Sequence, residues 1–166
     1  IPRQSVIANA GNDTSFCQNG SVMLNASGSV NGVNYQWFEI PANTSVGNTL
    51  TVSVAPPIGT TDYYVTVDNG TGCADNDTIT VVSNALPTAN AGPDVSIVIA
   101  QSTPIGGSPT TSAAGASVLW SPLPGLDNAT AFNPIATPST TTIYTVTVTS
   151  AQGCTASDSM IVTVLP

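Results

Sequence analysis

Three aspartates stand close together in one stretch of the sequence. They are Asp68, Asp75 and Asp77, and Asn69 and Asn76 lie between them. Calcium takes six to eight oxygen ligands, which such side chains supply, so this stretch is a candidate Ca²⁺ site. No DxDxDG loop is present, and solvated turn acids remain the preferred interpretation.

The side chains that most enzymes use for acid–base or nucleophilic chemistry are scarce. The sequence has no His, and one Lys or Arg against nine Asp and Glu, for a net charge of −8. Without imidazole, a Ser or Cys nucleophile lacks its usual base. Asp75 and Asp77 would share a face of a strand, but a glycosidase pair also needs a cleft and one raised pKa, and nothing in the sequence indicates either. We expect no catalysis and no cofactor.

The shortage of cations also excludes two classes of partner. Nucleic acids and anionic membrane surfaces are bound through clustered Lys and Arg. No run of 18 apolar residues, the length of a membrane helix, occurs either. Charged residues make up 6% and hydrophobic residues 41% of the chain, which also holds 14 Gly and 13 Pro. A composition rich in Val, Thr, Gly and Pro indicates short strands joined by turns.

The sequence contains an internal repeat. Residues 8–13, ANAGND, return 81 positions later as residues 89–94, ANAGPD. The segment from Tyr63 to Asp77 matches residues 144–158 at the same offset, and Trp37 matches Trp120. We therefore expect two modules, residues 1–86 and 87–166.

Each copy also repeats an aspartate beside a glycine. Asp13 follows Gly11, and Asp94 follows Gly92. We expect both carboxylates to accept nearby backbone N–H groups in an Asx-type turn.

The three cysteines show no CxxC spacing, and the repeat indicates which of them occupy equivalent positions. Cys73 and Cys154 are equivalent, whereas Val98 stands where the first copy has Cys17. We expect a Cys17–Cys73 disulfide, which would stabilise the first copy by roughly 4 kcal/mol, and an unpaired Cys154. The alternative is that all three are free, small buried side chains.

Alternating apolar residues predict the strands. Tyr63, Val65 and Val67 alternate with polar residues, and residues 144–149 repeat the pattern. A hairpin turn follows at 69–72 or 150–153, and about seven short strands per copy indicate a Greek-key β-sandwich. The fold class is therefore all-β.

The position of each aromatic residue along its strand predicts whether its side chain faces the core or the solvent. Trp37 and Trp120 face the same way as an apolar neighbour two residues earlier, so we expect both in the core. Phe38 and Tyr64 have the opposite parity and are the candidates for an exposed contact.

Four stretches of the second copy form a recognisable set: residues 89–94, Trp120-Ser121-Pro122, residues 144–148 and residues 153–158. Together they resemble PKD-like, immunoglobulin-like repeats. Such repeats occur in tandem in large secreted or cell-surface proteins of Bacteroidetes type, including adhesins and gliding-associated proteins. The resemblance implies a secreted, extracellular location and a stalk, spacer or adhesive role. Trp37-Phe38-Glu39 departs from the Trp-Asp-Phe-Gly-Asp-Gly pattern of PKD repeats, so no role tied to that motif is implied.

Sites of attached sugar are also predicted. Asn-x-Ser/Thr acceptors occur seven times, at Asn12, Asn19, Asn25, Asn43, Asn69, Asn76 and Asn128. The resemblance implies a further type of site, the Asp-Ser/Thr-aliphatic motif of bacterial O-glycosylation, at Thr78 and Ser159.

Three functions remain open. The first is a non-catalytic structural or adhesive stretch of a cell-surface protein or fibre, and the recurrence of Leu86-Pro87 as Leu165-Pro166 suggests that a further repeat follows. The second is a filament subunit that donates the strand Ser5, Val6, Ile7 and Ala8 to a neighbour. The third is a carbohydrate-binding module of a secreted hydrolase. The expected partners are neighbouring repeats, copies of the chain itself, or surface glycans.

Overall fold

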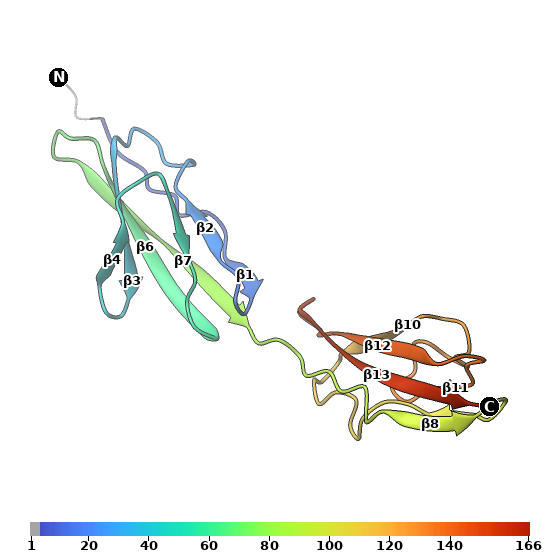
Figure 1. Ribbon diagram of the computed structural model, residues 1–166. Coiled ribbons are helices and arrows are strands. Elements are labelled where there is room, and N and C mark those ends of the chain that lie inside the picture. Colours follow the sequence, from blue (N-terminus) through green and yellow to red (C-terminus); the bar gives the residue numbers. More distant parts are fainter. Residues whose placement is uncertain (1–3) are drawn as a thin grey trace. The chain divides into compact units, whose positions relative to one another are not determined.

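A computed structural model describes residues 4–166 of the chain (Figure 1). Within these residues the regular elements are all β-strands, and none is a helix able to span a membrane. The chain divides into two compact units, Ile1–Ala85 and Leu86–Pro166. We refer to them as module 1 and module 2 and describe each by itself.

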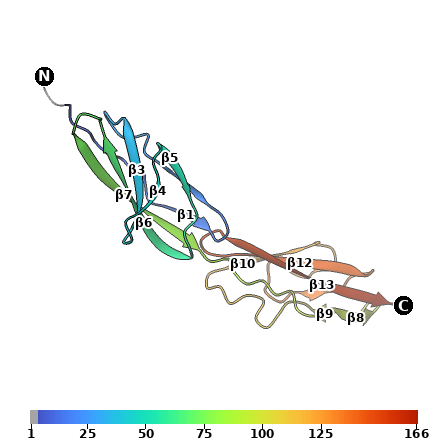
Figure 2. The ribbon, with the colours of Figure 1, turned by 60° about the vertical axis from the view of Figure 1, so that its left-hand side comes forward.

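The described part of module 1 contains seven strands. Five form one sheet in the order β1-β7-β6-β3-β4 (Figure 2), and β2 and β5 pair separately. The strands are β1 (Thr14–Cys17), β2 (Val22–Asn25), β3 (Asn34–Ile40), β4 (Thr44–Gly47), β5 (Thr51–Val54), β6 (Gly59–Asp68) and β7 (Ala74–Asn84).

The core of module 1 follows from period-two alternation. Tyr63, Val65 and Val67 on β6 are buried, as are Ile79 and Val81 on β7, while their sequence neighbours are more exposed. Successive side chains of a strand point to opposite faces, so each strand contributes one row to the interior. These rows pack with side chains from the β2–β5 pair in one hydrophobic cluster.

Module 2 repeats this plan with six strands in its described residues. The larger sheet has the order β10-β12-β13-β8, and β9 pairs with β11. The strands are β8 (Val95–Val98), β9 (Thr103–Pro104), β10 (Ser117–Ser121), β11 (Ile135–Ala136), β12 (Thr142–Thr149) and β13 (Thr155–Leu165). The β9–β11 pair is shorter than β2–β5, and Pro104, which has no N–H to donate, lies in it.

The two tryptophans confirm the predicted core positions. Trp37 and Trp120 are both 0% exposed. Each indole Nε1 donates a hydrogen bond to a backbone carbonyl, Thr49 O in module 1 and Ala131 O in module 2, both at 3.1 Å. A buried indole N–H needs such a partner.

The first and last strands of each module pair in the same way. In module 1, β1 runs parallel to β7, with Thr14 opposite Val81 and Cys17 opposite Asn84. In module 2, β8 runs parallel to β13, with Val95 opposite Val162 (Figure 1). Every partner in module 2 stands 81 positions after its counterpart. The predicted all-β fold and the duplication of one sandwich unit are confirmed.

Candidate functional site

Two aromatic rings meet on the outer face of the larger sheet of module 1. Phe38 on β3 lies directly opposite Tyr64 on β6. Their ring centroids are 4.9 Å apart and the ring planes differ by 16°, so the rings are stacked. Both side chains are half-buried. The sequence marked both residues as candidates for an exposed contact, and the structure brings them together.

The residues beside this aromatic pair are small or polar. Ser45 on β4 is opposite Phe38, and Thr78 on β7 is opposite Tyr64. The Tyr64 hydroxyl donates a hydrogen bond to Asn43 Oδ1 in the β3–β4 turn.

Two further rows of the register flank the aromatic pair. One row consists of Gln36, Thr66 and Asn76, and the other contains Asp62 and Thr80, whose side chains are joined by a 2.8 Å hydrogen bond from Thr80 Oγ1 to Asp62 Oδ1. The face therefore combines two rings with amide, hydroxyl and carboxylate groups. Sequence reasoning did not identify Gln36, Ser45 or Asp62 as members of a site, because only the register places them there.

The same face of module 2 has no aromatic pair. Ser121 on β10 is opposite Thr145 on β12, which is opposite Ser159 on β13. The hydroxyls of Thr145 and Ser159 are 2.8 Å apart. The two modules thus share a scaffold and differ in the chemistry of this row.

The predicted calcium ligands are not gathered in the structure. Asp75 Oδ2 accepts the Ala8 N–H at 2.9 Å, and Asp77 Oδ2 accepts the Ala10 N–H at 2.8 Å. Asp68 lies on β6, opposite Ala74. Among residues 4–166, no three His, Cys, Asp or Glu side chains are placed to hold a metal ion. The aspartates of β7 instead bind the backbone that precedes β1.

Asp68 has a different set of partners. Its Oδ1 accepts hydrogen bonds from Asn34 Nδ2 and from the Gly70 N–H, both at 2.7 Å. These bonds favour the ionised carboxylate and hold the pKa of Asp68 below its usual value. Because the folded-state pKa is lowered, the stabilisation is present above the usual pKa of an aspartate and is lost as the pH falls through the lowered value.

Asp13 and Asp94 were predicted to accept backbone N–H groups close to them in the sequence. This prediction was wrong, because the donors are distant in the sequence. Asp13 Oδ1 accepts the N–H of Thr80 at 2.9 Å, and Asp94 Oδ1 accepts the N–H of Ile161 at 2.8 Å. Each donor lies 67 residues further along the chain. The local turns are formed by Asn9 and Asn90, whose Oδ1 atoms accept the N–H groups of the glycines two residues later.

The predicted Cys17–Cys73 disulfide is not formed. Cys73 is a free cysteine, whereas Cys17 and Cys154 are each disulfide-bonded, so the expectation of an unpaired Cys154 was also wrong. Because β1 runs parallel to β7, Cys17 lies opposite Asn84, at the far end of β7 from Cys73. The 11 residues of β7 separate the two by roughly 35 Å at the usual rise per strand residue, whereas a disulfide requires Cα atoms within about 7 Å.

The predicted donor strand, Ser5–Ala8, packs within its own module. Val6 and Ala8 belong to the core cluster. Ile7 exchanges two backbone hydrogen bonds with Val30, at 3.1 and 2.8 Å. A donated strand would first have to give up these contacts.

The candidate glycosylation residues lie at the surface. Asn69 is half-buried, and its Oδ1 accepts hydrogen bonds from Thr71 and Cys73. The others are exposed: Asn12, Asn19, Asn25, Asn43, Asn76, Asn128, Thr78 and Ser159. Attachment of sugar at these residues remains a prediction.

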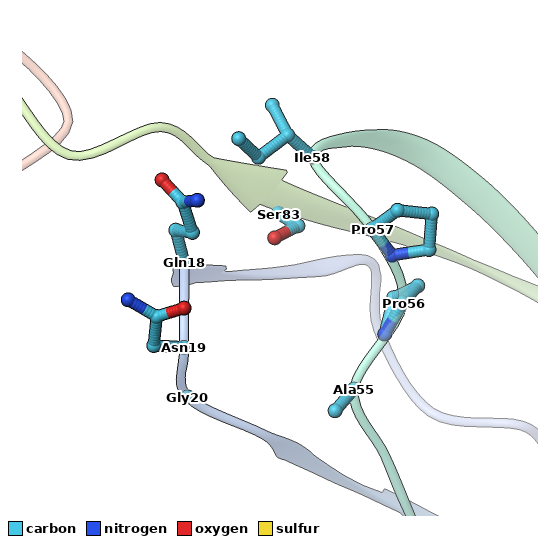
Figure 3. A pocket seen from close by; sticks show the side chains of 8 residues that line it. All are labelled: Gln18, Asn19, Gly20, Ala55, Pro56, Pro57, Ile58 and Ser83. Atoms are coloured by element: carbon cyan, nitrogen blue, oxygen red, sulfur yellow. The ribbon is translucent and has the colours of Figure 1, made fainter.

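A hollow of about 630 Å³ opens at the end of module 1 where β1 and β7 finish (Figure 3). The side chains of Gln18 and Asn19 stand on one side of it, and Pro56, Pro57 and Ile58 stand on the other. Among the described residues, those that line it are uncharged: Gln18, Asn19, Gly20, Ala55, Pro56, Pro57, Ile58 and Ser83. The hollow therefore offers hydrogen-bonding groups and apolar surface.

Comparison with solved structures shows the fold class independently. A titin I-band fragment, I67–I69, aligns with a TM-score of 0.51 at 15% identity over 98% of this chain and 66% of that chain. The insect immune protein hemolin aligns with a TM-score of 0.50 at 16% identity over 96% of this chain and 47% of that chain. The present chain thus spans about two thirds of the titin fragment and about half of hemolin. Among curated proteins, none matches the sequence.

A family model also matches the amino-acid sequence. The model described as "Ig-like domain CHU_C associated" matches residues 2–87, which is just over half of the chain. Ig-like domain families are generally non-catalytic and form structural or binding modules. The chain belongs to the family of CHU_C-associated Ig-like domains.

Proposed function

We propose that the chain is a structural stretch of an extracellular protein, and that each of its modules withstands tension applied between its two ends. The resemblance to tandem repeats of secreted surface proteins supports the extracellular location, as does the shortage of charged residues. A module in such a stretch has to stay folded when the chain is pulled.

The observation that carries this proposal is the parallel pairing of the first and last strands in each module. Pulling the chain ends draws β1 towards its N-terminal side and β7 towards its C-terminal side. Because the strands are parallel over four residue pairs, their evenly spaced hydrogen bonds are loaded in shear and resist together. A hairpin opened from its free ends would instead lose its bonds one after another.

The aspartates on the last strand extend this attachment. Asp77 holds Ala10, and Asp13 is bound to the Thr80 N–H. In module 2, Asp158 Oδ2 holds the Ala91 N–H at 2.8 Å. The segment that precedes the first strand is therefore tied to the last strand by charge-assisted hydrogen bonds, which are stronger than neutral ones.

The filament hypothesis receives less support. A donor strand formed by Ser5–Ala8 would have to leave a core in which Val6 and Ala8 are 9% exposed. Strand exchange between chains would also separate the segment from Asp75.

Single-molecule pulling of the full chain through its ends tests the proposal. In reducing buffer, where disulfides do not limit extension, we expect two separate unfolding events. Each should release roughly 80 residues, or about 280 Å of extended chain. Gradual extension without distinct events would contradict the proposal.

A variant pair at Ile99 tests the role of the terminal strands. The Ile99 N–H donates to Leu165 O at 2.9 Å, and the side chain is 55% exposed. Ile99→Pro removes this donor, which costs about 1 kcal/mol, and should lower the force of one of the two events. Ile99→Ala keeps the N–H and should leave both forces unchanged. Equal forces in the two variants would count against the terminal pairing.

A further inference from the structure

We propose that the outer face of β3 and β6 in module 1 binds a neutral glycan chain, with Phe38 and Tyr64 as the residues that stack on the sugar rings. This binding site is additional to the structural role and does not depend on it.

The aromatic rings stand upright on neighbouring strands. Their centroid separation of 4.9 Å matches the usual spacing of about 4.7–4.9 Å between paired strands. Since the planes are within 16° of parallel, each ring turns one face to its partner and the other face to the next strand. The residues there are Ser45 and Thr78, whose side chains are much smaller than an aromatic ring.

The chemistry of the surrounding groups suits a sugar. The face of an aromatic ring carries partial negative charge and attracts the C–H bonds on the flat side of a pyranose. Sugar hydroxyls need both donors and acceptors, which the side chains of Gln36, Thr66 and Asn76 provide in the next row of the sheet.

The aromatic pair is held in place before any ligand arrives. Each ring stacks on the other, and the Tyr64 hydroxyl is bound to Asn43. Ordering a free side chain on binding costs conformational entropy, so this arrangement favours binding. Neither ring belongs to the hydrophobic cluster of module 1.

Charge selects a neutral glycan over an acidic one. Asp62 stands in the row next to the aromatic pair and Asp68 stands two rows from it on the other side, and the whole chain carries a net charge of −8. A uronate or sulfate group would be repelled by this field. A neutral hexose or pentose chain would not.

Module 2 supplies an internal control. Ser121 and Thr145 stand in the row of its sheet that corresponds to Phe38 and Tyr64. The scaffold is the same, but no ring is available for stacking. Binding should therefore belong to module 1 alone.

Isothermal titration of the full chain with defined hexasaccharides tests the site. The neutral probes are cellohexaose, xylohexaose and mannohexaose, and the acidic probe is hexagalacturonate. We expect at least one neutral probe to bind and the acidic probe to bind more weakly. Binding of none of the neutral probes, or a preference for hexagalacturonate, would overturn the proposal.

Variants then assign the binding to the aromatic pair. Phe38→Ala and Tyr64→Ala should each weaken the neutral complex by roughly tenfold or more, because each removes one stacking face. Phe38→Trp should retain binding and shows that the site tolerates another ring. Ser121→Ala and Thr145→Ala are the matched controls and should change affinity less than about twofold.

Circular dichroism of each variant establishes that it is folded before titration. Full affinity in folded Phe38→Ala, or an equal loss in the module 2 controls, would overturn the site. Neither result would alter the two unfolding events on which the structural proposal depends, so the two proposals fail separately.

Discussion

In each module, an aspartate of the last strand binds the segment that precedes the first strand. Asp77 and Asp158 stand 81 residues apart and make the same bond, to Ala10 and to Ala91. Both alanines are 0% exposed. Their N–H groups have no water to replace a lost acceptor.

Removing one of these carboxylates should therefore destabilise its module. We expect Asp77→Ala to lower the free energy of unfolding by roughly 1–3 kcal/mol, measured by urea denaturation. Asp62→Ala, which removes an exposed bond to Thr80, is the control and should cost about 0.5 kcal/mol or less. Equal losses of unfolding free energy in the two variants would show that the bond to Ala10 stabilises the module no more than an exposed bond does.

Buried tyrosines predict a loss of stability in alkali. Burial raises the pKa of Tyr63, with a smaller contribution from the charge of Glu39, and burial also raises the pKa of Tyr144. The unfolded chain then ionises first, so the stabilisation is complete below the unfolded pKa of about 10 and is lost as the pH rises through the folded value.

Denaturation between pH 9 and pH 11.5 measures this effect. We expect Tyr63→Phe to reduce the decline in unfolding free energy above about pH 10. Tyr144→Phe should do the same from a lower starting stability, because it also loses a 3.1 Å bond to Pro124 O. A decline as steep in both variants as in the natural chain would contradict the assignment to these tyrosines.

At the scale of the strands, local alternation carries much of the prediction. Tyr63, Val65 and Val67 mark β6 because a half-buried strand repeats every two residues. The parity of Phe38 and Tyr64 likewise predicts their outward direction. Their contact could not be predicted, since it depends on the register between β3 and β6.

Partners that are distant in sequence mark the limit of such reasoning. The bond from Thr80 to Asp13 spans 67 residues, and no local pattern indicates it. The cysteine prediction failed for a related reason. The repeat assigns equivalent positions, whereas a disulfide depends on which end of β7 lies beside Cys17.

The direction of β1 keeps Cys17 away from Cys73, and Cys73 is the free cysteine. We expect the non-reduced chain to present one titratable thiol, that of half-buried Cys73, in an assay with a thiol-specific reagent in denaturant. Cys73→Ala should abolish the signal. Three reactive thiols, or a signal that survives this substitution, would contradict the assignment.

The whole molecule repeats one Ig-like unit. In both copies the first and last strands of the module pair in parallel. Four residue pairs form this junction in each module. The modules diverge at the aromatic row and in the length of the smaller strand pair. A shared scaffold with different surfaces is consistent with a structural stretch in which one module also binds a ligand.

The dependence of the unfolding force on pulling speed tests this central claim most directly. Strands loaded in shear break when their hydrogen bonds lengthen, so the distance to the transition state should be about 2–3 Å in both modules, close to the length of one such bond. Unzipping one residue pair releases two residues of extended chain, so the distance to the transition state would be about 7 Å or more. A short distance for both events is the expected result, and a long distance for either would contradict the role of the paired terminal strands.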